Sequence, residues 1–164
     1  MTWNKKIAAK QYKSIETLSI DVIRWKNHHK KIVFTNGCFD ILHLGHIDYL
    51  CKAADLGDKL IIGVNTDTSV TKLKGPKRPI IDEESRITKL ASLQFVDAVI
   101  LFDEETPIHL IKKIQPDVLV KGGDYSIDTI VGASQILKNG GMVKVIPFLK
   151  GYSSTNYIQK IKKE

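Results

Sequence analysis

The sequence has few cysteines and no long apolar segment. Its 164 residues include two cysteines, Cys38 and Cys51, whose spacing matches no metal-binding motif. The longest apolar runs, such as 98–102, span about five residues, far fewer than the ~20 that cross a bilayer. The first thirty residues contain lysines but no apolar stretch of the kind found in signal peptides. We therefore expect a cytoplasmic protein that does not bind membranes and has no disulfide framework or metal site of its own.

Positive charge is in excess but unevenly placed. The chain carries 25 Lys and Arg against 18 Asp and Glu, for a net charge of +7. Residues 1–31 hold eight basic and two acidic residues, whereas 32–149 hold 13 and 15. The surplus lies at the two ends, which favours a small anionic partner over nucleic acid. A basic α/β module that binds nucleic acid is the non-enzymatic alternative.

Short β-branched runs alternate with segments of helical spacing. The runs are 32–35, 60–65, 98–102, 118–121 and 143–147. Between two of them, Ile108, Ile111 and Ile114 recur at helical intervals. Alternating strands and helices form right-handed βαβ units. We expect one Rossmann-like α/β domain over 31–164, with a five-stranded parallel sheet covered by helices on both faces. A helical extension over 1–30 precedes it, and a helix over 153–163 ends it.

The first strand leads through a glycine-bearing turn into a helix start, Thr35-Asn36-Gly37-Cys38-Phe39-Asp40-Ile41-Leu42-His43-Leu44-Gly45-His46. Free N–H groups and the positive dipole end of a helix favour an anion there. His43 and His46, three positions apart, point to one side, and Gly45 lets a ligand approach the backbone. The pair is suited to stabilising a phosphate; the alternative is two helix-capping surface histidines. Zinc is disfavoured because no third ligand accompanies them.

Two further segments could bind a polyphosphate. Ser153, Ser154 and Thr155 form a hydroxyl-rich helix start that can donate hydrogen bonds to phosphate, or that simply caps the helix. The stretch Lys72-Leu73-Lys74-Gly75-Pro76-Lys77-Arg78 predicts a mobile basic loop. Lys74, and after it Lys72, are the expected phosphate contacts, whereas Lys77 and Arg78 are expected at the surface. The alternative is a solvated loop without a ligand.

The segment Val120-Lys121-Gly122-Gly123-Asp124-Tyr125 follows another strand. Its two glycines allow backbone contact with a flat base or a ribose. Asp124 can accept a hydrogen bond from a ribose hydroxyl or a base amine. A simple turn is the alternative interpretation.

Taken together, the His43-Leu44-Gly45-His46 and Ser153-Ser154-Thr155 segments resemble the hallmarks of the HxGH nucleotidyltransferase superfamily, which is cytidylyltransferase-like. Tyr152 stands where the second motif usually has Ile. Residues 32–160 are most similar to the adenylyltransferases that make ADP-heptose from D-glycero-β-D-manno-heptose 1-phosphate. The rival family, the glycerol-3-phosphate cytidylyltransferases, carries Arg where this chain has Phe148, and a Gly-Asp-Asp-Trp-like motif in place of Gly122-Gly123-Asp124-Tyr125.

This resemblance implies an enzyme that transfers AMP from ATP to a sugar 1-phosphate and releases pyrophosphate. The implied catalytic residues are His43, His46 and Lys74. The implied nucleotide contacts are Cys38, Phe39, Gly45, Gly123, Asp124, Ser153, Ser154 and Thr155. The implied substrate-binding residues are Asp67, Lys72 and Lys121, with Arg86 in support. Mg²⁺ would arrive with ATP, held mainly by phosphate oxygens. The resemblance also implies a stand-alone form of an activity that many bacteria fuse to a sugar kinase, and it is compatible with a homodimer.

Overall fold

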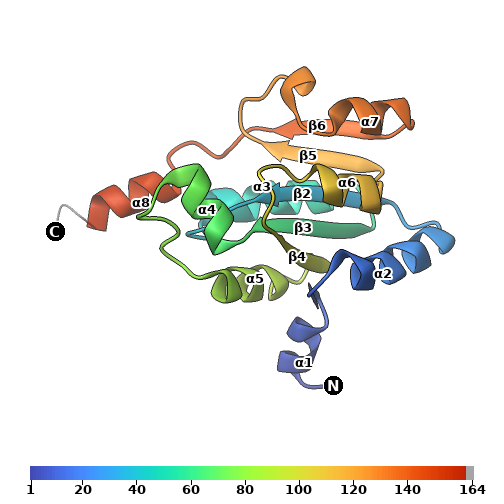
Figure 1. The fold of residues 1–164 in the computed structure, drawn as a ribbon, viewed down its shortest axis with the longest axis horizontal. Coiled ribbons are helices and arrows are strands. Elements are labelled where there is room, and N and C mark those ends of the chain that lie inside the picture. Colours follow the sequence, from blue (N-terminus) through green and yellow to red (C-terminus); the bar gives the residue numbers. More distant parts are fainter. Residues whose placement is uncertain (162–164) are drawn as a thin grey trace.

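The computed structural model describes residues 1–161 and contains a six-stranded sheet in the order β1-β4-β3-β2-β5-β6, with all neighbouring strands parallel. The strands are β1 (Gln11–Tyr12), β2 (Ile32–Gly37), β3 (Lys59–Asn65), β4 (Ala98–Phe102), β5 (Val118–Gly122) and β6 (Met142–Ile146). The α-helices are α1 (Trp3–Ala8), α2 (Ile15–Asn27), α3 (Leu44–Ala54), α4 (Asp67–Lys74), α5 (Glu83–Ala91), α6 (Ile108–Ile114), α7 (Ala133–Lys138) and α8 (Ser154–Ile161), and a 3₁₀ turn spans Ile127–Thr129. Helices cover both faces of the sheet (Figure 1). The expected Rossmann-like α/β class is therefore confirmed.

The sheet has one strand more than the sequence indicates. The five expected strands correspond to β2 through β6, and the count of five is wrong because β1 adds a sixth. Gln11 and Tyr12 of β1 pair with Val99 and Ile100 of β4. No apolar run marks these two residues. Their strand conformation depends on long-range pairing with the edge of β4, which cannot be predicted from a local sequence pattern.

Apolar side chains form one layer on each face of the sheet. Successive strand residues point to opposite faces, so Phe34 and Ile61 pack with α2, α6 and α7, whereas Val33 and Ile62 pack with α3 and α5. This two-sided burial explains why the strands appear as continuous apolar runs in the sequence.

The N-terminal segment is part of this packing. Helix α2 begins after Ser14, whose hydroxyl accepts a hydrogen bond from the Thr17 N–H at 3.4 Å. Leu18 and Val22 of α2 are buried in the layer that also holds α6. Residues 1–30 thus contribute an edge strand to the sheet and a helix that packs against one of its faces.

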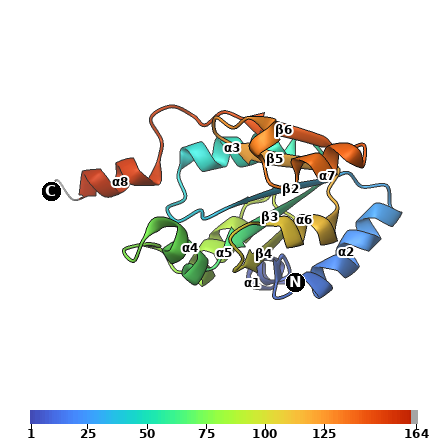
Figure 2. The ribbon, with the colours of Figure 1, turned by 45° about the horizontal axis from the view of Figure 1, so that its top comes forward.

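Helix α8 extends away from the sheet (Figure 2). None of its residues is buried. It begins at Ser154, one residue later than expected, and residues 162 and 163 of the expected helix lie outside the described part of the chain. None of the described helices is both long and apolar enough to cross a membrane.

The order of the strands fixes where a ligand can bind. After β2 the chain forms β3 and β4 on one side, and it then returns to form β5 on the other side of β2. The strand order therefore reverses between β2 and β5, and the crevice beyond the carboxyl ends of these strands is the usual ligand site of such sheets.

Candidate active site

A cavity of about 480 Å³ opens at this edge of the sheet. Six of the residues predicted from the sequence line it: Cys38, Phe39, His46, Lys74, Lys121 and Ser154. They come from the turn after β2, from α3, α4 and β5, and from the start of α8. A larger hollow of about 950 Å³ is lined by Lys26, Gln115 and Gly140, among others, and by none of the predicted residues. We place the site at the carboxyl edge because the polar groups converge there.

His43 and His46 form a stacked pair at the start of α3. Their ring centroids are 3.8 Å apart and their planes differ by 19°. His43 is the N-cap residue, and its Nδ1 accepts a hydrogen bond from the backbone N–H of His46 at 3.3 Å. Tyr157 of α8 stacks with His43 at a centroid distance of 5.9 Å, and Phe39 lies edge-on to His46 at 5.3 Å. His43 therefore caps the helix and stacks behind His46, and it does not itself line the cavity.

Burial favours the uncharged form of both imidazoles. Burial, assisted by His43 and Lys74, lowers the pKa of His46 to about 4. Burial also lowers the pKa of His43. Within residues 1–161, Nδ1 of His46 is buried and has no hydrogen-bond partner. An anion in the cavity would supply the charge that favours protonation of the pair.

Gly45 has a packing role between the two histidines. It is buried, and a Cβ there would lie 3.1 Å from Nδ1 of His43 and 3.1 Å from Cβ of Tyr152. The space that the sequence suggested for a ligand next to Gly45 is thus occupied by the protein's own side chains. A glycine at this position lets the chain before α8 pack against the start of α3.

A buried carboxylate fixes the turn that precedes the histidines. Asp40 accepts hydrogen bonds from the backbone N–H groups of Ile80 and Ile81, at 2.8 and 2.9 Å, and from Nε of Arg78. Burial opposes ionisation, but the hydrogen bonds from Ile81, Arg78 and Ile80 together lower the pKa of Asp40. Arg78 is only 15% exposed, so the surface position expected for it is wrong. Sequence reasoning also missed Asp40, whose only signal was a carboxylate in an otherwise apolar turn.

Arg86 of α5 anchors the same turn from the other side. Its guanidinium is fully buried and donates to the carbonyls of Cys38, at 2.6 Å, and Ile81, at 3.0 Å. It also pairs with the carboxylate of Asp67 at 2.8 Å. Asp67, expected to bind substrate, thus faces Arg86 and does not line the cavity.

The first three residues of the predicted basic loop, 72–74, belong to helix α4. Thr66 caps α4 by accepting a hydrogen bond from the Ser69 N–H at 3.1 Å, and the helix continues to Lys74 before Gly75 adopts a positive φ of 92°. Lys74 lines the cavity, whereas the ammonium of Lys72 lies 3.8 Å from the carboxylate of Asp103 and does not. The expectation of a loop over 72–78 is therefore wrong for 72–74, whereas 75–78 lie outside helices and strands.

Phe148 lies against the glycines at the end of β5. A Cβ at Gly122 would be 2.5 Å from its ring, and Gly123 has a φ of 113°. Gly123 and Asp124 line a separate shallow hollow of about 580 Å³. The two residues expected to contact the nucleoside therefore line a different hollow from His46, and Tyr125 and Phe148 border both hollows.

One of the three residues of the hydroxyl-rich segment lines the same cavity as His46. Ser154 lines the cavity, and its Oγ donates to the Ile41 carbonyl at 3.4 Å. Ser153 caps α8 by accepting a hydrogen bond from the Asn156 N–H at 3.1 Å. Thr155 is exposed, and neither it nor Ser153 lines the cavity.

Comparison with known proteins is consistent with this geometry. Residues 34–160 match the family described as cytidylyltransferase-like. The chain is 50% identical over 149 residues to the bifunctional protein HldE of Citrifermentans bemidjiense, covering 91% of this chain and 31% of that protein. It is 50% identical over 148 residues to the bifunctional protein HldE of Methylobacillus flagellatus, covering 90% and 30%. The chain thus spans about a third of the length of these curated relatives.

Solved structures include a shorter relative. A lipopolysaccharide core biosynthesis protein from Thermoplasma volcanium is 36% identical, with a TM-score of 0.58, and the match covers 76% of this chain and 99% of that one. The pantoate-beta-alanine ligase of Francisella tularensis shares the fold alone, at 17% identity and a TM-score of 0.59, covering 94% and 79%. These matches confirm the resemblance that the His43–His46 motif indicated.

Proposed function

This chain belongs to the cytidylyltransferase-like family and is a nucleotidyltransferase, and we propose that it transfers AMP from ATP to D-glycero-β-D-manno-heptose 1-phosphate. The products are ADP-heptose and pyrophosphate. The observation that carries this proposal is the convergence of His46, Lys74, Lys121 and Ser154 on one cavity. Imidazole, ammonium and hydroxyl groups are suited to phosphates.

The reaction needs positioning more than acid–base chemistry. A phosphate oxygen of the sugar phosphate forms a bond to the α-phosphorus of ATP, and the bond from that phosphorus to the oxygen of pyrophosphate breaks in line. The attacking phosphate is already an anion at pH 7, because its second pKa is ~6. The protein must therefore bring two anions together and stabilise the charge that develops on the leaving pyrophosphate.

We assign roles toward the nucleotide accordingly. His43 and His46 act on the α- and β-phosphates, and Lys74 adds positive charge from the end of α4. Ser154 exchanges its hydrogen bond to the Ile41 carbonyl for one to the β- and γ-phosphates, with Ser153 and Thr155 at the same helix start. Cys38 and Phe39 contribute backbone N–H groups, for which Arg86 and Asp40 fix the turn. We assign Gly123 and Asp124 to the nucleoside, next to the Phe148 ring.

Mg²⁺ is proposed as the cofactor. Within residues 1–161, no group of three or more His, Cys, Asp and Glu side chains could hold a metal ion, and the Asp40 carboxylate in the cavity is occupied by Arg78 and two backbone N–H groups. This donor set suits an ion that enters with ATP and is held by phosphate oxygens. The ion would neutralise phosphate charge.

We place the reaction in the cytoplasm, where the free Cys38 and Cys51 stay reduced.

Two features favour the heptose substrate over glycerol 3-phosphate. The first is identity of 50% to bifunctional HldE proteins and of 36% to a lipopolysaccharide core biosynthesis protein. The second is Phe148 against Gly122, where cytidylyltransferases of the rival family are expected to carry Arg.

A substrate panel tests the proposal. The protein is incubated with Mg²⁺, each nucleoside triphosphate in turn, and either heptose 1-phosphate or glycerol 3-phosphate, and pyrophosphate release is measured. We expect release with ATP and heptose 1-phosphate. Release with CTP and glycerol 3-phosphate alone would establish the rival activity. Tight, salt-dependent binding of oligonucleotides without turnover would favour the nucleic-acid-binding alternative.

A further inference from the structure

Glu105 brings a carboxylate into a cavity that otherwise suits anions. Among the described residues that line the cavity, the carboxylates are those of Asp40 and Glu105. Asp40 is paired with Arg78 and accepts hydrogen bonds from two backbone N–H groups. Glu105, in contrast, is exposed and forms none of the ion pairs closer than 4.0 Å within residues 1–161. Its charge is therefore available to a ligand.

This carboxylate lies on the opposite side of the sheet from the histidine pair. Tyr49 places α3 in the apolar layer on one face, whereas Leu110 places α6 in the layer on the other face. Figure 1 shows these two helices on opposite sides of the sheet. Glu105 lies just before the start of α6, and His46 lies in the first turn of α3. The cavity thus spans the carboxyl edge of the sheet, with His46 on one side and Glu105 on the other.

Two hydroxyl groups line the cavity on the same side as Glu105. Thr106 follows it in the chain, and Thr129 lies in the 3₁₀ turn before α7. Ile130, next to Thr129, is buried in the apolar layer that also holds α6, which places this turn on the Glu105 side. The Thr129 hydroxyl donates to the Ser126 carbonyl at 2.8 Å, so its own oxygen can still accept a hydrogen bond. This side of the cavity therefore offers acceptors for hydroxyl groups.

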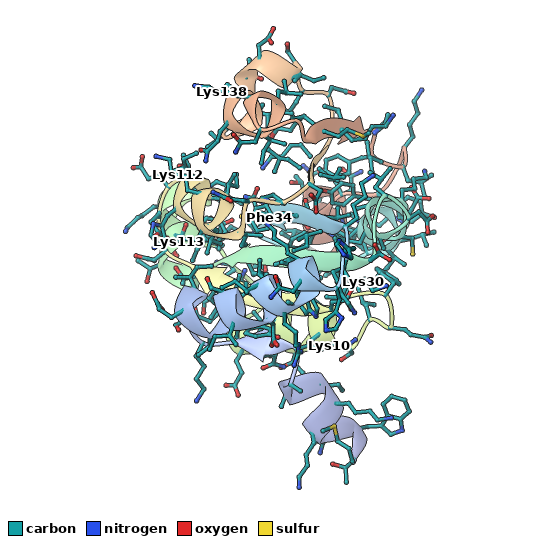
Figure 3. The ribbon with its side chains drawn as sticks, turned by 90° about the vertical axis from the view of Figure 1, so that its right-hand side faces the viewer. Lys10, Lys30, Phe34, Lys112, Lys113 and Lys138 are labelled. Atoms are coloured by element: carbon teal, nitrogen blue, oxygen red, sulfur yellow. The ribbon has the colours of Figure 1, made fainter. Side chains whose placement is uncertain are left out.

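The neighbouring cations do not neutralise Glu105. The ammonium of Lys121 donates to Oδ1 of Asn36 at 3.0 Å and, like those of the other described lysines, is more than 4.0 Å from the Glu105 carboxylate. Lys112 and Lys113 belong to the last turn of α6, at the end of the molecule that faces away from α8 (Figure 3). A carboxylate without a cation repels phosphate but accepts hydrogen bonds from hydroxyl groups. Glu105 is therefore suited to the uncharged part of a phosphorylated substrate.

We propose that Glu105, Thr106 and Thr129 form a hydroxyl-binding wall for the acceptor, and that Glu105 selects a polyhydroxylated sugar phosphate. This assignment rests on the proposed function and extends it to the specificity for the acceptor. A carboxylate can accept hydrogen bonds from two hydroxyls at once, and threonine can donate or accept. The sequence assigned substrate binding to Asp67, whose carboxylate is paired with Arg86 instead.

The position of the hydroxyl-binding wall agrees with in-line attack. The incoming oxygen and the leaving pyrophosphate lie on opposite sides of the α-phosphorus. His46 is assigned to the phosphates of the nucleotide, and the wall lies on the other side of the sheet from it. An acceptor held by the wall would therefore approach the α-phosphorus from the side opposite the leaving group.

Glu105→Gln tests the wall, because it exchanges the carboxylate for an amide of the same shape. We expect the KM for heptose 1-phosphate to rise about tenfold, as for loss of a hydrogen bond to a charged group, with the KM for ATP within a factor of about three. Thr106→Val should raise the KM for heptose 1-phosphate by a smaller factor. The matched control is Glu104→Gln, since Glu104 is the neighbouring exposed carboxylate and is not among the residues that line the cavity. It should leave both KM values unchanged.

Deoxy analogues of the acceptor show whether the contact is with a hydroxyl. The wild type and Glu105→Gln are compared on heptose 1-phosphate and on analogues that each lack one hydroxyl. For the analogue that lacks the hydroxyl bound by Glu105, the KM values of the two proteins should become nearly equal. The same KM ratio for every analogue would overturn the assignment and leave the proposed function intact.

Binding and Mg²⁺ dependence separate the wall from other roles of the carboxylate. Heptose 1-phosphate, titrated calorimetrically into protein saturated with α,β-methylene ATP, should bind Glu105→Gln more weakly, with unchanged binding of the ATP analogue. An unchanged KM for heptose 1-phosphate would overturn the proposal, and a higher Mg²⁺ requirement in that case would show that Glu105 holds the ion. Because Glu105 is exposed, the variant should keep the free energy of unfolding of the wild type. Absence of turnover with every substrate pair in the wild type would instead refute the proposed function.

Discussion

The imidazole rings of His43 and His46 stack with their centroids 3.8 Å apart. Two imidazolium cations at this distance would repel each other, and the lowered pKa values of both residues show that burial already favours the neutral forms. Burial therefore favours the neutral form of both rings. In the proposed reaction, the pair would stabilise phosphate through hydrogen bonds and through a proton taken up when phosphate arrives.

Replacing one ring of the pair should remove most of the activity. His46→Asn keeps a hydrogen-bonding group but removes the imidazole that faces the cavity, and we expect kcat/KM to fall ~10²–10³-fold, as for loss of a charge-stabilising donor. Pyrophosphate release measures the effect. His109→Asn, on the exposed surface of α6, serves as the control. A folded His46→Asn variant with full turnover would disprove the assigned role.

The same residue should make stability depend on pH. The pKa of His46 is about 4 in the folded protein, below its usual value of 6.5. As the pH falls below 6.5, the unfolded chain binds a proton that the folded chain does not, so the folded state loses stability. The loss should reach about 2 kcal/mol between pH 7 and pH 5. Urea unfolding at pH 7, 6 and 5 measures it.

The variant His46→Asn is the reference for this measurement, because its side chain does not titrate. Its stability should fall less over the same pH interval. Parallel curves for the two proteins would show that His46 is not desolvated as described.

The strands and the position of the site could be predicted from local patterns. β2 through β5 are largely buried on both faces and therefore appear as apolar runs, and the two histidines lie in the segment that follows the first of them. β1 could not be predicted, because its two residues depend on pairing with β4. Asp40 and Arg78 were missed for a related reason. Their burial results from contacts between segments 38 residues apart, which no spacing rule records.

Asp40 should be important for stability. Its buried carboxylate neutralises the charge of Arg78 and accepts hydrogen bonds from two backbone N–H groups. Removing one member of a buried pair leaves the other uncompensated, so Asp40→Ala should lower the free energy of unfolding by ~3–5 kcal/mol. Asp48→Ala breaks the exposed helical pair with Lys52 and should cost less than ~1 kcal/mol. Chemical denaturation compares the two variants, and equal losses would contradict the buried network.

The N-terminal segment should be required for folding of the sheet. Leu18 of α2 is fully buried, whereas Ile20, two positions later, is 70% exposed. Leu18→Ala should therefore lower the free energy of unfolding by ~2–5 kcal/mol, and Ile20→Ala by far less. Thermal and urea unfolding measure both. Similar, small effects would mean that 1–30 is an appendage and not part of the fold.

The fate of the α-phosphate tests the central claim most directly. ATP carrying ³²P at the α-phosphate is incubated with the protein, Mg²⁺ and heptose 1-phosphate, and the products are separated. The account predicts that the label appears in the sugar nucleotide and that the released pyrophosphate is unlabelled. Label recovered in ADP would show that the γ-phosphate is transferred instead, and it would contradict attack at the α-phosphorus beside His43 and His46.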